Sequence, residues 1–187
     1  METEKRSQDS DLGCWAGQLS MLTAEADTHG RAHLERSIGM LLRVVREQLK
    51  LEVVFVGEFV DGERVFRHIS ARAQEPVIQV GQSHPLDKTI CQRIVEGRMP
   101  RLIGNVAQER TRYALPEYYE VLGGHIGVPV RFADGSLYGV LCGFSFTACD
   151  HLDERDVRRL EMAAGAAARL LAQAEGRDVD RSLDPLN

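Results

Sequence analysis

The sequence lacks the features that place a protein in a membrane, outside the cell or along nucleic acid. Its N-terminal residues METEKRSQDSD are charged, so we expect no secretory signal peptide. No apolar run approaches the roughly 20 residues that a membrane-spanning helix needs. A formal net charge of −5 argues against non-specific nucleic-acid binding. We therefore expect a cytoplasmic protein with neither a membrane nor a nucleic acid as a direct partner.

Cysteine is scarce, and its spacing excludes the common paired-thiol motifs. No CxxC pattern occurs among the 4 cysteines, which are Cys14, Cys91, Cys142 and Cys149. In a reducing compartment we expect all of them to be free thiols. The separation of Cys142 and Cys149 matches no recognised metal-ligand spacing, so no metal site is expected.

The chain has 187 residues, a length that suits one domain with extra residues at its ends. Hydrophobic periodicity predicts three helices within it. Residues 1–10 are interpreted as a disordered tail, followed from Asp11 by a short amphipathic helix. Longer helices are predicted from Ala32 to Leu49 and from Leu152 to Ala174, with Asp150 as the cap of the latter. We assign residues 1–31 to the tail and first helix, 32–174 to the domain and 175–187 to a flexible C-terminal tail.

Two β-hairpins are predicted between the longer helices. The runs LEVVFVGEFV and RVFRHISA are β-branched and aromatic, and Asp61-Gly62 separates them. The runs HIGVPVRFA and SLYGVLCGFSF flank Asp134-Gly135 in the same way. Asp-Gly between two such runs is typical of a tight hairpin, because both residues tolerate positive φ.

The order helix, hairpin, irregular middle, hairpin, helix predicts an α+β fold. An antiparallel sheet that is apolar on both faces cannot bury them alone. We expect the two longer helices on one face and the lid, residues 84–122, over the other. A ligand pocket would then lie between the sheet and the lid.

Three segments together resemble a GAF domain, the sensory module of many bacterial signalling proteins. They are TICQRIVEGRMPRLIGNV, IGVPVRFADGSLYGVLCGFSF and LDERDVRRLEMAAG, and the resemblance covers about residues 32–173. It implies a GAF/PAS-like central antiparallel sheet of about five or six strands, with helices behind and a ligand cavity in front. Gly127 and Gly139 are expected to relieve crowding where their strands approach a neighbouring layer. No segment resembles a kinase, cyclase, phosphodiesterase or DNA-binding output, so the chain is a stand-alone sensor or part of a longer protein.

The resemblance also implies a thiol-dependent alternative. Free-methionine-sulfoxide reductases are GAF domains with a cysteine at a position like Cys91, near Lys88 and Arg93, which favour a lowered thiol pKa. Their catalytic cysteine lies in the loop before the second hairpin. That region here, NVAQERTRYALPEYYEVLGG, has none. We therefore expect Cys91 to be a packed thiol facing the core or the cavity.

Other ligand chemistries remain open. His125 would hydrogen-bond a ligand or, as in haem-binding GAF sensors, hold iron, and the first role is favoured. A bilin is disfavoured because Cys91 is followed by Gln92 rather than by histidine. Cyclic nucleotides or organic acids would suit the lid's arginines, although solvated side chains are the commoner outcome; these are Arg93, Arg98, Arg101, Arg110 and Arg112.

The aromatic residues of the lid are the best indication of a cavity, because tyrosine combines an apolar ring with a polar tip. They equally allow a filled space and a domain that serves only as a dimerisation scaffold. Our interpretation is a non-enzymatic sensor that binds an unknown small molecule, with no cofactor named. We expect a homodimer through the terminal helices, with Ala164 and Ala167 in its interface, and an output domain or partner protein. The predicted ligand-binding residues are Thr89, Cys91, Tyr113, Tyr118, Tyr119, His125 and Phe144.

Overall fold

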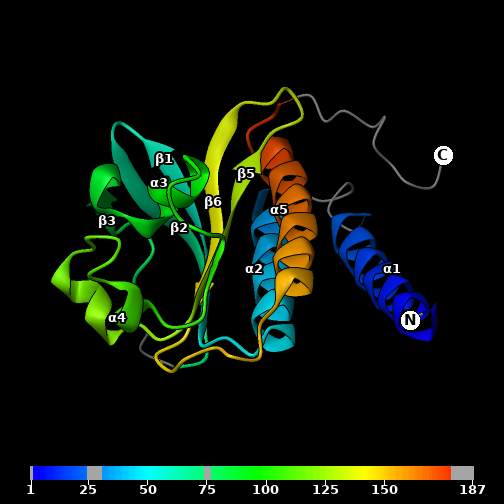
Figure 1. Cartoon of the computed structure of the whole chain (residues 1–187). Coiled ribbons are helices and arrows are strands. Elements are labelled where there is room, and N and C mark those ends of the chain that lie inside the picture. Colours follow the sequence, from blue (N-terminus) through cyan, green and yellow to red (C-terminus); the bar gives the residue numbers. More distant parts are fainter. Residues whose placement is uncertain (1, 25–30, 74–76, 178–187) are drawn as a thin grey trace.

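One antiparallel sheet separates two dissimilar layers (Figure 1). Its strands are β1 (Val53–Val60), β2 (Glu63–Ala71), β3 (Ser83–Pro85), β4 (Leu102–Ile103), β5 (His125–Arg131) and β6 (Leu137–Phe144). They form a 6-stranded sheet in the order β3-β2-β1-β6-β5-β4. The computed structural model describes residues 2–24, 31–73 and 77–177. The predicted α+β fold is confirmed.

Both predicted hairpins are present, but their turns differ. In the first, Asp61 and Gly62 have φ of 51° and 77°, as a two-residue turn between β1 and β2 requires. In the second, Gly135 has a φ of 82°, and the Asp134 carboxylate accepts the Ser136 backbone N–H at 2.8 Å. The loop is longer than a two-residue turn, and the β5–β6 register shifts between Val130 and Arg131.

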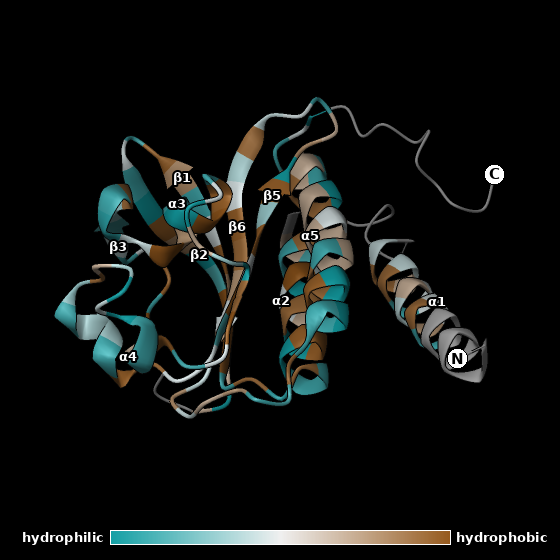
Figure 2. Ribbon diagram, viewed as in Figure 1, coloured by the Kyte–Doolittle hydropathy of each residue, from teal (hydrophilic) through white to brown (hydrophobic). Residues whose placement is uncertain are grey.

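Helices α2 (Arg31–Gln48) and α5 (Glu154–Ala174) cover one face of the sheet, and α1 (Glu2–Ala24) packs outside them (Figure 1). Hydrophobic residues concentrate on α2 and the central strands, between which the main core lies (Figure 2). None of the helices in the described ranges is long and apolar enough to cross a bilayer. The core includes Ile38, Leu41, Leu42 and Val45 of α2, Val54 and Val56 of β1, Ile126 and Val128 of β5, and Leu160 and Leu170 of α5.

Helix α1 begins at Glu2 rather than at Asp11, so the expected disordered tail is wrong for residues 2–10. Trp15 and Leu19 are buried in the main core, and the Trp15 Nε1–H donates to the carbonyl oxygen of Arg159 at 3.1 Å. Asp11 forms an ion pair with the Arg159 side chain. The apolar side of α1 therefore packs mainly on α5 of the same chain. Residues 25–30 and 178–187 lie outside the described part.

Helix α5 starts with a capping box, and its N-cap is not the aspartate that we predicted from the sequence. The Asp153 carboxylate accepts the Arg155 N–H at 2.8 Å, and the Asp156 carboxylate accepts the Asp153 N–H at 3.1 Å. Asp153 thus caps the helix in place of Asp150. Ala164 and Ala167 are 4% and 0% exposed within the single chain, so the expectation that they form a dimer interface is wrong.

The lid covers the opposite face of the sheet, as expected (Figure 1). It contains short elements: η2 (Leu86–Lys88), α3 (Ile90–Val95), α4 (Val106–Glu109) and η3 (Glu117–Val121), together with strand β4 and part of β3. Its own buried side chains form a cluster that includes Ile90, Ile94, Met99, Val106 and Leu115. These side chains pack chiefly against one another. Space therefore remains between η3 and the sheet.

Two glycines permit the close approach of neighbouring groups, but the groups that they meet first lie on paired strands of the same sheet rather than in a neighbouring layer as predicted. A Cβ at Gly139 would overlap the carbonyl oxygen of Gly57 on the paired strand β1. A Cβ at Gly127 would lie 2.6 Å from the Cys142 sulfur. Neither position accepts a side chain without a shift of the sheet or of that thiol.

We predict opposite effects for two glycine-to-alanine substitutions. Gly139→Ala should lower the free energy of unfolding by about 2 kcal/mol or more, because backbone at β1 must move. Gly165→Ala should raise it by about 0.5–1 kcal/mol, since Gly165 lies within α5 with open space around it. Urea unfolding of both variants measures the difference. Equal effects of the two substitutions would contradict this account of the sheet.

Candidate ligand-binding site

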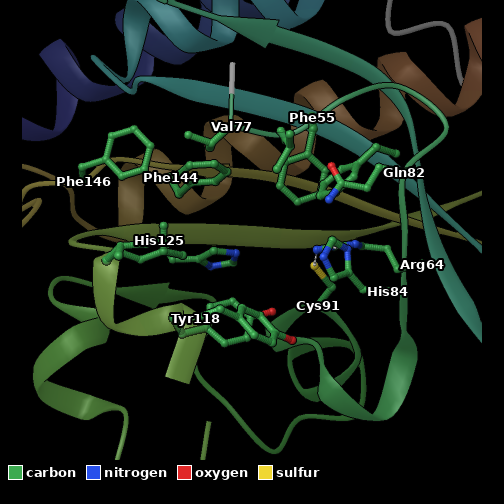
Figure 3. A pocket seen from close by; sticks show the side chains of 15 residues that line it. Phe55, Arg64, Val77, Gln82, His84, Cys91, Tyr118, His125, Phe144 and Phe146 are labelled. Carbon is green, nitrogen blue, oxygen red and sulfur yellow. Dashed lines mark hydrogen bonds between the residues drawn. The ribbon is translucent and has the colours of Figure 1, made fainter. Parts of the chain in front are cut away.

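A cavity of about 250 Å³ lies between the sheet and the lid (Figure 3). Strands β1, β2 and β6 form one wall, and α3, η3 and the loop before β3 form the others. The lining residues are Phe55, Arg64, Phe66, Val77, Ile78, Gln82, His84, Cys91, Tyr118, Tyr119, Val121, Leu122, His125, Phe144 and Phe146.

The sheet side of the cavity is aromatic. The ring centroids of Phe55 and Phe66 are 4.8 Å apart in an edge-to-face arrangement, and those of Phe55 and Phe144 are 6.4 Å apart. Phe146 continues the row at 5.7 Å from Phe144. Such rings offer faces and edges to a flat apolar ligand.

Arg64 places a cation in this apolar surface. Strand alternation puts it on the same face of β2 as Phe66, and its guanidinium carbon lies 4.0 Å from the Phe66 ring centroid and 5.4 Å from that of Phe55. A Cβ at Gly57 would lie 3.0 Å from the Arg64 Cγ, so glycine makes room for the arginine stem. The Arg64 residue is only 6% exposed.

The guanidinium group has weak compensation for its burial. Its Nη2 donates to His84 Nδ1 at 2.9 Å and its Nη1 to Cys91 Sγ at 3.4 Å, while its Nε is buried without a hydrogen-bond partner. No carboxylate forms an ion pair with Arg64 within residues 2–24, 31–73 and 77–177. Burial acts to lower the pKa of Arg64, but the combined effect of its neighbours, Cys91 first among them, more than offsets burial and raises the pKa. The cation is therefore permanent.

His84 is neutral in this arrangement. Arginine only donates hydrogen bonds, so Nδ1 of His84 carries the lone pair and its proton resides on Nε2. Burial, followed by the charge of Arg64, lowers the pKa of His84. His84 thus orients the guanidinium without adding a second charge.

Two buried thiols meet beside Arg64, although Cys91 belongs to α3 and Cys142 to β6. Their sulfur atoms are 3.8 Å apart. The ligating atoms of Cys91, Cys142 and His125 all lie within 4.8 Å of one another. The hydrogen bond from Cys142, helped by the cation of Arg64, holds the pKa of Cys91 well below its ordinary value. Burial, with the bond to Cys91, raises the pKa of Cys142 well above its ordinary value.

Two tyrosines tie η3 to the start of α3. The Tyr119 hydroxyl accepts the Ile90 backbone N–H at 3.2 Å, and the Tyr118 hydroxyl donates to the Lys88 carbonyl oxygen at 3.1 Å. Their ring centroids are 4.6 Å apart. Burial raises the pKa of both phenols, so both stay protonated. These two tyrosines therefore add no charge to the lid wall.

The structure brings most of the predicted binding residues to the cavity but not all of them. Cys91, Tyr118, Tyr119, His125 and Phe144 line it; their contact with a ligand stays a prediction.

Thr89 and Tyr113 do not line the cavity. Thr89 is the N-cap of α3, where its hydroxyl accepts the Gln92 N–H at 3.1 Å and donates to the Leu86 carbonyl oxygen at 2.8 Å. Tyr113 packs on the internal cluster of the lid, and Arg93 donates to its carbonyl oxygen.

None of the lid arginines singled out in the sequence lines the cavity. Arg98, Arg101 and Arg112 pair with Glu96, Glu161 and Glu109 on the surface. The cavity arginine is instead Arg64, on the first hairpin. Its signal in the sequence was its position two residues before Phe66 on a strand, which puts the charged group on the same apolar face as that ring.

A cavity under a lid, on the face of an antiparallel sheet opposite its terminal helices, is the architecture of a small-molecule-binding α+β domain. The family model described as GAF domain matches residues 33–172, which is more than half of the chain. The chain therefore belongs to the GAF domain family.

Solved structures share this fold at low sequence identity. The GAF domain of an Acinetobacter phosphoenolpyruvate-protein phosphotransferase is 17% identical with a TM-score of 0.65, covering 84% of this chain and 92% of that one. The phycoerythrobilin-bound GAF domain of a cyanobacterial phytochrome is 17% identical with a TM-score of 0.67, covering 86% and 95%. The free methionine-R-sulfoxide reductase of Neisseria meningitidis, in complex with its substrate, is 18% identical with a TM-score of 0.62, covering 84% and 88%. Comparison with the sequences of curated proteins finds no match.

Proposed function

We propose that this GAF domain is a non-enzymatic sensor of a compact organic anion that combines a flat apolar body with one carboxylate or similar group. The observation that supports this proposal is the buried guanidinium of Arg64, whose Nε lacks a partner inside an aromatic cavity. The apolar body would lie among Phe55, Phe66 and Phe144. Its anionic group would accept hydrogen bonds from Arg64.

The energetics of burial favour an anionic ligand over a neutral one. Removal of a charge from water is costly unless hydrogen bonds and an opposite charge replace the lost hydration. Arg64 has aromatic faces, a neutral imidazole and the Cys91 sulfur as neighbours, so the one neighbour that lowers its cost of burial by charge is a thiolate at 3.4 Å. The planar fork of Arg64 also suits a carboxylate. A bound anion would supply the compensation that the protein alone provides only in part.

Cavity size favours a small ligand. At about 250 Å³ the cavity lies below the roughly 300–1,000 Å³ of pockets for drug-sized molecules. A tetrapyrrole or a cyclic nucleotide would need the lid to open. This supports a compact ligand over the haem, bilin and nucleotide alternatives.

Signal transfer would follow the packing of the two layers. The lid contacts the cavity face of β1, β5 and β6, and α2 and α5 pack on the other face of these strands. A ligand that orders η3 and α3 would shift the strands against the terminal helices. The cytoplasmic location, the homodimer and the output partner belong to this proposal.

A thiol-dependent reductase is the second candidate, and a specific contact favours it. Cys142 supplies a second thiol 3.8 Å from Cys91. The sequence suggested no such partner, because it has no cysteine in the loop before β5. Both sulfurs are buried, which argues against easy access by a substrate.

The sensor proposal predicts charge-selective binding that depends on Arg64. Benzoate should bind, while benzamide of the same shape should bind at least about tenfold more weakly, since hydrogen bonds to charged groups contribute about 1.5–3 kcal/mol. Arg64→Met should abolish this preference. Arg98→Met is the matched control, because Arg98 lies on the surface beside Glu96, and it should leave binding unchanged. Isothermal titration calorimetry provides the measurement, and equal affinities for benzoate and benzamide in the unmodified protein would overturn the proposal.

The non-enzymatic part of the proposal predicts no turnover of free methionine sulfoxide with a dithiol reductant. Methionine release, followed by chromatography, should equal that of a sample without protein. Turnover by the unmodified protein that disappears in Cys91→Ser would establish the reductase instead.

The dimer expected through the terminal helices needs an apolar surface other than the buried alanines. Met21 of α1 and Met40 of α2 are exposed beside a groove between these helices. Met40→Glu should therefore convert dimers to monomers in light scattering. Val80→Glu, an exposed site outside the helices, should not. A wild-type protein that is monomeric at all concentrations, or a Met40→Glu dimer of unchanged stability, contradicts this interface.

A further inference from the structure

A cluster of sulfur and nitrogen donors beside the cavity offers metal-binding chemistry that the anion binding proposed above does not use. It joins Cys91 of α3, His125 of β5 and Cys142 of β6, three residues that are distant in the sequence and buried in the fold. The register of the sheet places His125 and Cys142 near each other. Cys142 pairs with Gly127, which lies two residues after His125 on β5 and therefore on the same face. We propose that these three side chains form a binding site for a thiophilic metal ion, with Zn²⁺ as the best-fitting candidate.

The distances match those that such an ion requires. Zinc is held at about 2.3 Å by each thiolate, so tetrahedral geometry places two ligating sulfurs about 3.8 Å apart. The sulfurs of Cys91 and Cys142 are 3.8 Å apart. All three donor atoms lie within 4.8 Å of one another, so one ion reaches them with small side-chain movements.

His125 provides an independent indication of a missing partner. It is 3% exposed, and its Nδ1 is buried without a hydrogen-bond partner. Buried polar atoms are rarely left unpaired in folded proteins. Its ring extends from β5 toward Cys91 in the cavity wall (Figure 3).

The surroundings suit a thiolate-bound ion. Arg64 Nη1 donates to Cys91 Sγ at 3.4 Å, which is the kind of outer hydrogen bond that orients a ligating sulfur. Two thiolates neutralise a divalent cation, so the ion adds no net charge beside Arg64. Gly127 keeps the space next to the Cys142 sulfur and the His125 ring free of a side chain.

Three protein ligands leave a tetrahedral ion with one position for another group. Cys91 and His125 line the cavity, so this position faces it. Sites with two cysteines and one histidine of this open kind bind an exogenous ligand, whereas closed structural sites have four protein ligands. The metal would thus lie within reach of small molecules that enter the cavity.

The test is metal binding by the reduced, untagged full chain in the absence of any organic ligand, so that it fails or succeeds separately from the benzoate experiment. After removal of metal with a chelator, one Zn²⁺ per chain should bind. X-ray absorption of this complex should show two sulfur neighbours at about 2.3 Å together with nitrogen or oxygen. Co²⁺ in place of zinc should give thiolate-to-metal charge-transfer bands and the intense visible bands of tetrahedral coordination.

Variants locate the site. Cys91→Ser and Cys142→Ser should each lose the thiolate–cobalt bands, while Cys14→Ser and Cys149→Ser should keep them. Circular dichroism shows whether each variant folds. If either Cys91→Ser or Cys142→Ser fails to fold, the X-ray absorption spectrum of the zinc complex of the unmodified protein decides whether sulfur ligates the metal. No uptake of Zn²⁺ by the reduced protein, a coordination shell without sulfur, or undiminished bands in a folded Cys142→Ser protein would each overturn the proposal.

Discussion

The central strands β1 and β6 carry apolar side chains on both faces, and burial of both faces requires a layer on each side. Helices α2 and α5 cover one face and form the main core with it. The lid covers the other with short elements that pack chiefly on themselves, so this face is covered without being filled. The cavity is therefore a consequence of how the second layer is built.

Arg64 determines the chemistry of that cavity. Gly57 admits its stem, two phenylalanine rings flank its guanidinium, and His84 and Cys91 accept two of its hydrogen bonds. A hydrophobic residue of similar length would satisfy the aromatic wall at less cost in desolvation. The proposed binding of an anion would account for a cation at this position. The same cation stabilises a thiolate at Cys91, which links the anion site to the cluster of Cys91, His125 and Cys142.

Local patterns in the sequence were sufficient for the fold. The period of 3.6 located α2 and α5, Asp61-Gly62 located the first turn, and the resemblance to GAF domains is confirmed. Boundaries were less predictable, because the helical period does not distinguish Asp153 from Asp150 as a cap. The site depended on long-range pairing: Cys91 and Cys142 meet only through the placement of α3 over β6. Arg64 was overlooked because arginine is usually solvated, and only its place two residues from Phe66, on the same face of β2, indicated burial.

The central claim is that Arg64 is the group that recognises an anionic ligand. The most direct measurement is the NMR resonance of the Arg64 Nε–H, which has no hydrogen-bond partner in the free protein. The account predicts that benzoate shifts this proton downfield as a carboxylate accepts its hydrogen bond, and that benzamide does not. Saturation of the protein with benzoate while this resonance stays unchanged would contradict the account.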